Sequence, residues 1–422
     1  MEKFKTAALK NSRRRFFMKS FGRTFFVFAA FSIFSLLIFS CEKNSELSNV
    51  RCEEKFTLNY GSLENQIRLF NLNSTEEINT HIAMRNGFFF ISNGESQKIL
   101  QMNSFGELLT LYHNPETNPA PLFDETGSNS DSAYSTKKTV AYPFNSPSFL
   151  AADSHQYFYA VETLPKERYE ISDERILRQI VLRFNSDSFV DYIGQQGIGG
   201  MPFPFIRNIY TTQANDLVVV CIVVEGFLIF CYDNSGTLLY EKLIKYSDAP
   251  EYGEKSQDTT FSEIENVVPD PSSRRLFVKA DYYENSDFEN FSEPLTVIFP
   301  FDPYNGEFKE GIEIPPYEES ITQGFAKQTY KLPYNFIGAA SDWLFFMISV
   351  DSGSVVQMVN FQNGRILRRH LGYDTSDTVY SAFSLSESGI ISALLAGREN
   401  AKVVWWRTDD LARSIAEAAQ EK

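Results

Sequence analysis

The sequence predicts an all-β protein of repeated design, because apolar runs of strand length alternate with polar turns along most of its 422 residues. Aromatic residues make up 15% of the chain, chiefly 39 Phe and 21 Tyr, and such side chains favour packed strands. The run Leu217–Val224 is apolar on both faces, as a strand covered on both sides requires, and it is too short to span a membrane. We therefore expect one large β domain.

A unit of apolar runs and turns recurs six times. Each unit has two runs, a polar turn rich in Asn, Asp or Gly, and a third run, except the sixth, which has only two runs. These turn residues supply positive φ angles or side-chain caps, which end the strands of a meander. The runs are, in order, Gly87–Ser92, Lys98–Met102 and Glu107–Tyr112; Tyr157–Glu162, Gln179–Phe184 and Phe189–Ile193; Leu217–Val224, Phe227–Tyr232 and Thr237–Leu243; Arg275–Ala280, Leu295–Phe301 and Phe308–Ile314; Trp343–Val350, Ser354–Phe361 and Arg365–Leu371; Gly389–Ala396 and Lys402–Arg407.

The spacing of the polar turns predicts a β-propeller. The turns between positions 106 and 409 recur about every 61 residues, which suits blades of several strands each. We expect six blades, with seven as the alternative. The last unit lacks an outer strand, and we expect Lys55–Tyr60 to supply it and close the ring, with Gln66–Leu72 as the competing segment. A short C-terminal helix is expected from Thr408, its N-cap, to Ala418.

The N-terminus has the layout of an export signal. Residues 1–23 carry eight basic residues and one acid, and residues 24–40 carry no charge. The segment Ile38-Phe39-Ser40-Cys41 resembles the lipobox of bacterial lipoproteins, although Phe39 replaces the usual small or aliphatic residue, a departure that spirochaetal lipoboxes tolerate. The resemblance implies cleavage between Ser40 and Cys41 and a membrane anchor through lipid on Cys41. It divides the chain into a signal peptide (1–40), a polar tether (41–53) and one propeller domain (54–422).

Three alternatives concern the same N-terminus. Seventeen apolar residues lie at the lower limit of the roughly 17–25 that span a bilayer, so an uncleaved signal anchor is the other reading. Translation could start at Met1 or at Met18, and Ser12–Phe17 resembles a twin-arginine signal. Under each of these alternatives, residues 42–422 lie outside the cytoplasm, in the cell envelope.

Turn spacing over nearly the whole exported part resembles the propeller domains of bacterial lipoproteins with NHL- or YVTN-like blades. The exported part has 31 basic and 53 acidic residues, a formal charge of −22, which disfavours nucleic acid as a partner. The resemblance implies a monomeric domain whose partners are the membrane and an envelope protein or glycan.

The cysteines are too few for a disulfide scaffold. Cys221 and Cys231 lie on neighbouring runs around Glu225-Gly226, and they would face each other only if the connecting loop held three residues. The alternatives are a disulfide between them or two buried thiols.

No arrangement of residues indicates a reaction. The four histidines, His81, His113, His155 and His370, are scattered, and the chain contains no nucleophile elbow or phosphate-binding loop. Ser349–Gly353 matches half of the Asp box of sialidase-type propellers and reads as a hairpin turn. We therefore predict no catalytic residue, metal or cofactor, and a lipid-anchored binding or scaffold protein of the cell envelope. The alternative is an envelope hydrolase or lyase that uses the central funnel of the propeller.

Overall fold

The computed structural model describes residues 47–69, 78–122, 137–172, 174–252, 259–284, 295–323 and 326–420, and residues 49–422 form one compact unit. The predicted signal peptide, its cleavage site at Ser40 and Cys41, and the lipid on Cys41 lie outside the described residues. Within them, no helix is long and apolar enough to cross a membrane.

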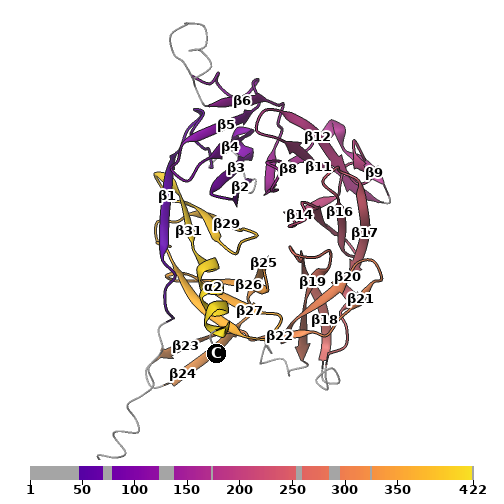
Figure 1. The fold of residues 1–422 in the computed structure, drawn as a ribbon, viewed down its shortest axis with the longest axis vertical. Coiled ribbons are helices and arrows are strands. Elements are labelled where there is room, and N and C mark those ends of the chain that lie inside the picture. Colours follow the sequence, from indigo (N-terminus) through magenta and orange to yellow (C-terminus); the bar gives the residue numbers. More distant parts are fainter. Residues whose placement is uncertain are drawn as a thin grey trace, which may run out of the picture. The chain divides into compact units, whose positions relative to one another are not determined.

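Six antiparallel sheets of the described chain surround a common axis and form the blades of a propeller, as predicted (Figure 1). The blades, from the inner strand outward, are β2(Thr80–Arg85), β3(Phe88–Asn93), β4(Lys98–Met102), β5(Leu108–His113) and the parallel β6(Lys138–Ala141); β7(Pro147–Ala152), β8(Phe158–Thr163), β11(Gln179–Phe184), β12(Phe189–Gly194) and β13(Gly197–Ile198); β14(Phe205–Thr211), β15(Leu217–Val223), β16(Gly226–Tyr232) and β17(Leu238–Lys245); β18(Thr259–Pro269), β19(Leu276–Glu284), β20(Leu295–Asp302), β21(Glu307–Phe308) and β22(Ile312–Ile314); β25(Asn335–Ala340), β26(Trp343–Val350), β27(Gly353–Asn360) and β28(Ile366–Gly372); and β29(Tyr380–Leu385), β30(Ile391–Ala396), β31(Asn400–Trp406) and β1(Cys52–Asn59).

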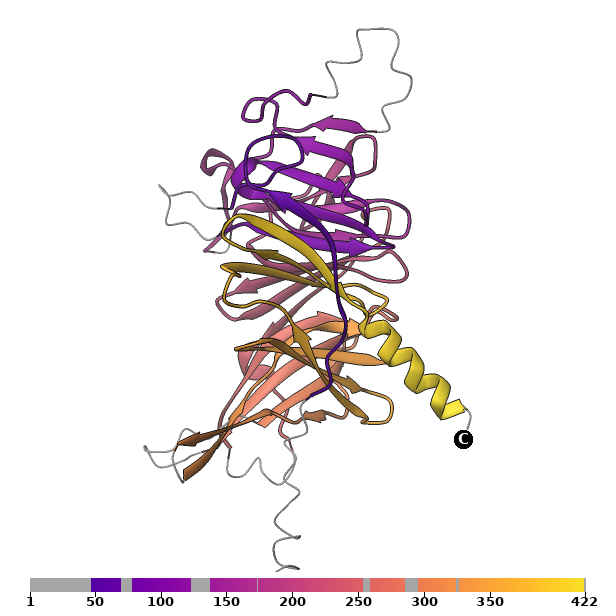
Figure 2. The same cartoon turned by 90° about the vertical axis from the view of Figure 1, so that its left-hand side faces the viewer.

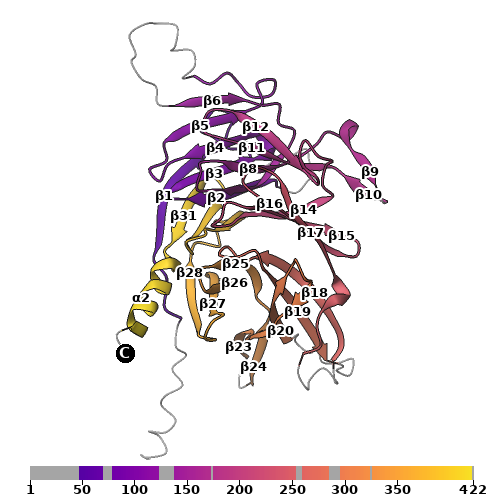
Figure 3. The same cartoon turned by 45° about the vertical axis from the view of Figure 1, so that its right-hand side comes forward.

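Two further hairpins and one helix stand outside these sheets. They are β9(Glu170–Ser172) with β10(Arg175–Leu177), β23(Tyr317–Gln323) with β24(Ala326–Leu332), and α2(Thr408–Gln420). Figure 3 shows β9 and β10 projecting from the second blade, and Figure 2 shows α2 leaving the ring on the side opposite β23 and β24. The helix begins at Thr408 as predicted, but the hydroxyl of this residue donates to the carbonyl of Gly389 in the sixth blade.

The innermost strand of every blade was absent from the predicted units. Backbone irregularities explain much of this, because the pairing register shifts within β7, β14, β18 and β25. A bulge adds one residue and reverses which residues face each side, so the two-residue alternation that marks a strand is interrupted.

The polar turns act as predicted, through side-chain caps. Asn103 Oδ1 accepts hydrogen bonds from the backbone N–H groups of Phe105 and Glu107, and Asp233 Oδ1 accepts from those of Ser235 and Thr237. The equivalent turns of the second, fourth and fifth blades use Asn185, Asp302 and Asn360 in the same way. Gly236 has a φ of +83°, a conformation that glycine adopts without strain.

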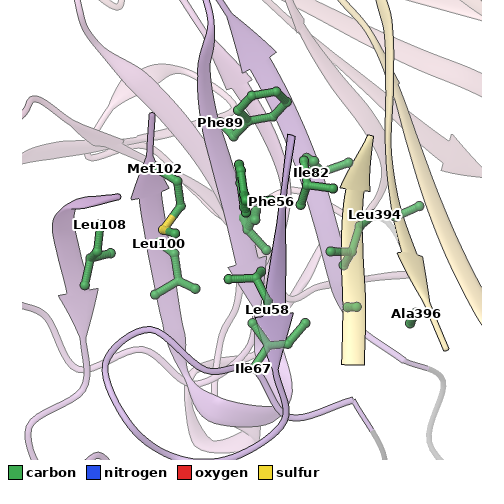
Figure 4. Packing of buried hydrophobic residues seen from close by; sticks show 14 of the residues in the cluster. Phe56, Leu58, Ile67, Ile82, Phe89, Leu100, Met102, Leu108, Leu394 and Ala396 are labelled. Atoms are coloured by element: carbon green, nitrogen blue, oxygen red, sulfur yellow. The ribbon is translucent and has the colours of Figure 1, made fainter. Parts of the chain in front are cut away.

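The N-terminal strand closes the ring, as predicted. β1 pairs antiparallel with β31 and is the outer strand of the sixth blade. Its side chains Phe56 and Leu58 belong to the hydrophobic cluster between the sixth and first blades (Figure 4). The ring centroids of Phe56 and Phe89 are 5.5 Å apart there, in an edge-to-face arrangement. The strand begins at Cys52, two residues before the expected domain boundary. The competing segment makes one isolated bridge, from Ile67 to Tyr60, and residues 70–72 of it lie outside the described chain.

The third blade is buried on both faces, as its apolar runs predicted. In β15, Val219 and Cys221 pack toward the second blade, and Val218 and Val220 pack toward the fourth. Each of these four side chains is at most 1% exposed.

The same register rules out the disulfide. Val223 pairs with Gly226, so the loop holds two residues, and Cys221 lies opposite Leu228 while Cys231 lies opposite Val218. Because Cys231 is three positions from Leu228, its side chain points to the other face of the sheet from Cys221. Both residues are buried free thiols, and burial raises the pKa of each.

Candidate functional site

The inner strands of all six blades surround the propeller axis (Figure 1), and residues at and just after these strands line a cavity of about 180 Å³. Drug-sized ligands occupy pockets of roughly 300–1,000 Å³, so this space is small. Its ionisable lining groups are His81 and Arg85 from β2, Tyr210 from β14 and Glu387 from the turn after β29. We refer to it as the axial cavity.

An ion pair between two neighbouring blades lines the axial cavity. Arg85 Nη2 lies 2.7 Å from Glu387 Oε1, and these side chains come from the first and sixth blades. Arg85 Nη1 donates to the carbonyl oxygen of Ala152 in the second blade, at 2.9 Å, and Thr211 Oγ1 of the third blade donates to the same oxygen, at 2.7 Å. The guanidinium therefore joins the first, second and sixth blades and is already neutralised by a protein carboxylate.

Part of this ion pair lacks a partner. Arg85 Nε and Glu387 Oε2 are buried and make no hydrogen bond within the described chain. An unpaired buried donor and acceptor are unfavourable, so water or a small polar ligand is the physical expectation here.

Asp153 is the other carboxylate near this end of the cavity, and its oxygens are occupied. Asp153 Oδ1 accepts from the backbone N–H groups of His155 and Tyr157, and the Tyr159 hydroxyl lies 3.4 Å from Oδ2. Burial raises the pKa of Asp153, while these backbone hydrogen bonds oppose the shift. The carboxylate caps the turn between β7 and β8.

His81 lies at the other end of β2, with its ring centroid 4.2 Å from that of Phe149. Burial lowers the pKa of His81 to about 4, so the imidazole is neutral at neutral pH. Among the described residues, no three His, Cys, Asp or Glu side chains gather in a way that could hold a metal ion.

The lowered pKa of His81 predicts a loss of stability in acid. Between pH 6.5 and pH 4 the unfolded chain binds a proton that the folded imidazole refuses, so the free energy of unfolding falls as the pH falls. The shift of about 2.5 pKa units corresponds to about 3 kcal/mol. Urea unfolding at pH 7.5 and pH 4.5 should show a smaller acid loss in a His81→Phe variant, by about 2–3 kcal/mol.

The exposed His155 provides the control for this experiment. A His155→Gln variant should lose as much stability in acid as the parent chain. An unchanged acid loss in His81→Phe would show that burial of His81 does not contribute.

Other residues that the sequence singled out have structural places. Ser349–Gly353 forms the turn between β26 and β27, with Val350 paired to Gly353, as the hairpin reading predicted. His113 and His370 lie in β5 and β28, away from the axial cavity.

Arg85 and Glu387 were missed by the sequence analysis. They lie at the end of one inner strand and just after another, and no inner strand had been located. Closure of the ring brings them together, and no local motif encodes that contact.

Fold and cavity together define a six-bladed β-propeller with a small, ion-paired axial site. Comparison with protein-family models gives no match, and neither does comparison with curated proteins. Among solved structures, a Bacteroides fragilis protein named as exported shares 8% identity over 86% of this chain and 97% of its own, with a TM-score of 0.39. The propeller domain of the Trilobed protease from Pyrococcus furiosus shares 7% over 78% and 93% (TM-score 0.38), and a gluconolactonase from Xanthomonas campestris shares 9% over 86% and 97% (TM-score 0.36).

Proposed function

We propose that this chain is an exported protein, anchored through lipid on Cys41, that binds a ligand in the cell envelope without cleaving it. The observation that carries the second part is the Arg85–Glu387 ion pair in the axial cavity. A hydrolase or lyase acting there would need a free acid and a free base within reach of its substrate. One oxygen of the carboxylate is instead paired at 2.7 Å, and the His81 imidazole, at the other end of β2, accepts a proton only near pH 4.

Residues on one side of the ring also support a binding function. On this side the second and fourth strands of each blade end, and we call it the insertion face. The β9–β10 hairpin and the loop after β15 both lie there, and Arg175 joins Glu225 across them at 3.1 Å. Ile171 is 79% exposed and Val224 is 92% exposed. Exposed apolar residues held on a fixed loop suit contact with a partner more than chemistry.

A test separates binding from cleavage. The full chain in mild detergent is incubated with envelope polysaccharide and with envelope protein extracts, and released reducing ends and peptide fragments are measured over time beside retention of material on the immobilised protein. We expect retention with no release above a heat-denatured sample. Release that disappears in a Glu387→Gln variant would overturn the binding proposal and support the axial enzyme.

The anchor has its own test. Metabolic labelling with a fatty acid should tag the parent chain, and a Cys41→Ser variant should carry no label and leave the membrane fraction. Equal labelling of both chains would overturn the proposed anchor, while a Cys52→Ser variant controls for loss of a cysteine.

A further inference from the structure

A second pocket, of about 320 Å³, lies over two turns of the fourth blade, which contains β18–β22 in Figure 1. Its lining includes Arg274 and Arg275 from the turn between β18 and β19, and Phe301, Tyr304 and Lys309 at and after the end of β20. It shares no lining residue with the axial cavity. We call it the rim pocket.

Both arginines of the rim pocket are fixed from behind by buried carboxylates. Arg274 Nε donates to Asp216 Oδ2 at 2.8 Å, and the Asp216 side chain is 3% exposed. Arg275 Nε donates to the fully buried Asp270 at 2.6 Å. Both Nη atoms of Arg275 have no hydrogen-bond partner in the described chain, whereas Arg274 Nη2 lies 3.4 Å from Asp216 Oδ1 and the guanidinium of Arg274 also interacts with the Tyr304 hydroxyl. A guanidinium held in place with free N–H groups is preorganised to bind an oxyanion.

Aromatic rings pack against two side chains of the rim pocket, Arg275 and Tyr304. The Arg275 guanidinium lies 5.1 Å from the Phe361 ring centroid and 5.5 Å from that of Phe277, which restrains its plane. Tyr304 is 58% exposed, and its ring packs edge-on against Tyr240 at 5.4 Å. An exposed but immobilised aromatic face suits the flat C–H face of a sugar ring, since little conformational freedom is lost on contact.

The rim pocket gathers three basic side chains on an acidic chain of net charge −15, and each is paired with an acid: Arg274 with Asp216, Arg275 with Asp270 and Lys309 with Glu307. Lys309 lies in the pocket with its side chain 58% exposed, and the Lys242 ammonium lies 5.7 Å over the Phe301 ring. Asp302 is the acid of the lining, and its Oδ1 accepts the backbone N–H of Tyr304.

From these contacts we propose that the rim pocket binds an acidic saccharide, with its carboxylate or sulfate on Arg274 and Arg275 and a sugar ring against Tyr304. The inference rests on the proposed binding function and names the ligand class for it. Carboxylate and sulfate can both present two acceptor oxygens to a guanidinium, so the experiment distinguishes them.

Native affinity electrophoresis of the full chain in mild detergent tests this inference. Gels contain dextran, dextran sulfate, polygalacturonate or polyglutamate, and the variants are Tyr304→Ala and Lys309→Ala. Matched controls exist on the first blade: Phe105 is an exposed aromatic residue on the equivalent turn, and Lys138 pairs with exposed Asp187 as Lys309 pairs with exposed Glu307.

We expect dextran sulfate, polygalacturonate or both to retard the parent chain, and dextran to leave it unchanged. Tyr304→Ala and Lys309→Ala should each weaken the apparent affinity at least fivefold, while Phe105→Ala and Lys138→Ala bind as the parent does. An Arg275→Lys variant, which keeps the charge and loses the fork, should weaken it as well.

Three results would overturn the proposal: no retardation by either acidic polysaccharide, equal retardation of the Tyr304→Ala and Lys309→Ala variants and the parent, or retardation by polyglutamate alone, which would indicate an acidic protein. Cleavage of a bound polysaccharide would instead contradict the proposed function while leaving the rim pocket as its binding site.

Discussion

A Phe56→Ala variant should lose about 3–5 kcal/mol of unfolding free energy, the largest effect expected of any single truncation in β1. Phe56 is 8% exposed and packs in the cluster that joins the sixth blade to the first, against Phe89 and beside Gly106. Loss of this ring leaves a cavity on the only sheet that is built from both ends of the described chain. Urea unfolding followed by tryptophan fluorescence measures the change, because Trp405 lies 6.1 Å from Phe89 in the same cluster.

Phe105→Ala is the control for this experiment. Phe105 is 84% exposed, so the substitution removes the same atoms from a surface turn. Its effect should stay within about 0.5 kcal/mol. If Phe56→Ala cost no more than the control, β1 would not be an integral strand of the sixth blade.

Lys279→Met should destabilise the fold by about 3–5 kcal/mol, because it leaves a buried carboxylate without its cation. Lys279 Nζ lies 3.0 Å from Asp281 Oδ2 and 3.1 Å from Glu265 Oε2, and the side chains of Lys279 and Asp281 are 3% and 6% exposed. Thr296 Oγ1 donates to the other oxygen of Asp281 at 2.6 Å. The ammonium is therefore the only positive charge that these contacts supply to Asp281.

A double variant, Lys279→Met with Asp281→Asn, separates charge from packing. It should recover most of the lost stability, since the amide is neutral and its oxygen still accepts from Thr296. Lys309→Met breaks an exposed ion pair and should cost less than about 1 kcal/mol. A double variant as unstable as Lys279→Met would mean that lost packing, and not the unpaired charge, causes the effect.

The outer three strands of the blades were predictable because each has a regular apolar run and an Asn, Asp or Gly turn. The closing role of β1 followed from a count of strands, since Lys55–Tyr60 alternates and the sixth unit was one strand short. The inner strands were not predictable by the same rule, and in four of them bulges such as that between Phe336 and Gly338 interrupt the alternation.

For a related reason, the sequence could not decide whether Cys221 and Cys231 form a disulfide or are two free thiols. Loop length decides which residues of a hairpin face each other, and a difference of one residue moves one thiol to the opposite face. The axial ion pair and the rim pocket depend on contacts between blades. Arg85 meets Glu387 only after the ring has closed, and Arg274 meets Asp216 only when the third and fourth blades pack together.

Closure of the ring by β1 is the claim on which the axial cavity and its ion pair depend, and a designed disulfide tests it most directly. Thr57 lies opposite Lys402 in the register of β1 and β31, and both residues are exposed. In a Cys52→Ser background, Thr57→Cys with Lys402→Cys should oxidise to a disulfide that links the corresponding peptides after proteolysis, whereas Thr57→Cys with Glu399→Cys should not. Failure of the first pair to form a disulfide, or equal yields from the two pairs, would contradict the closed six-bladed ring.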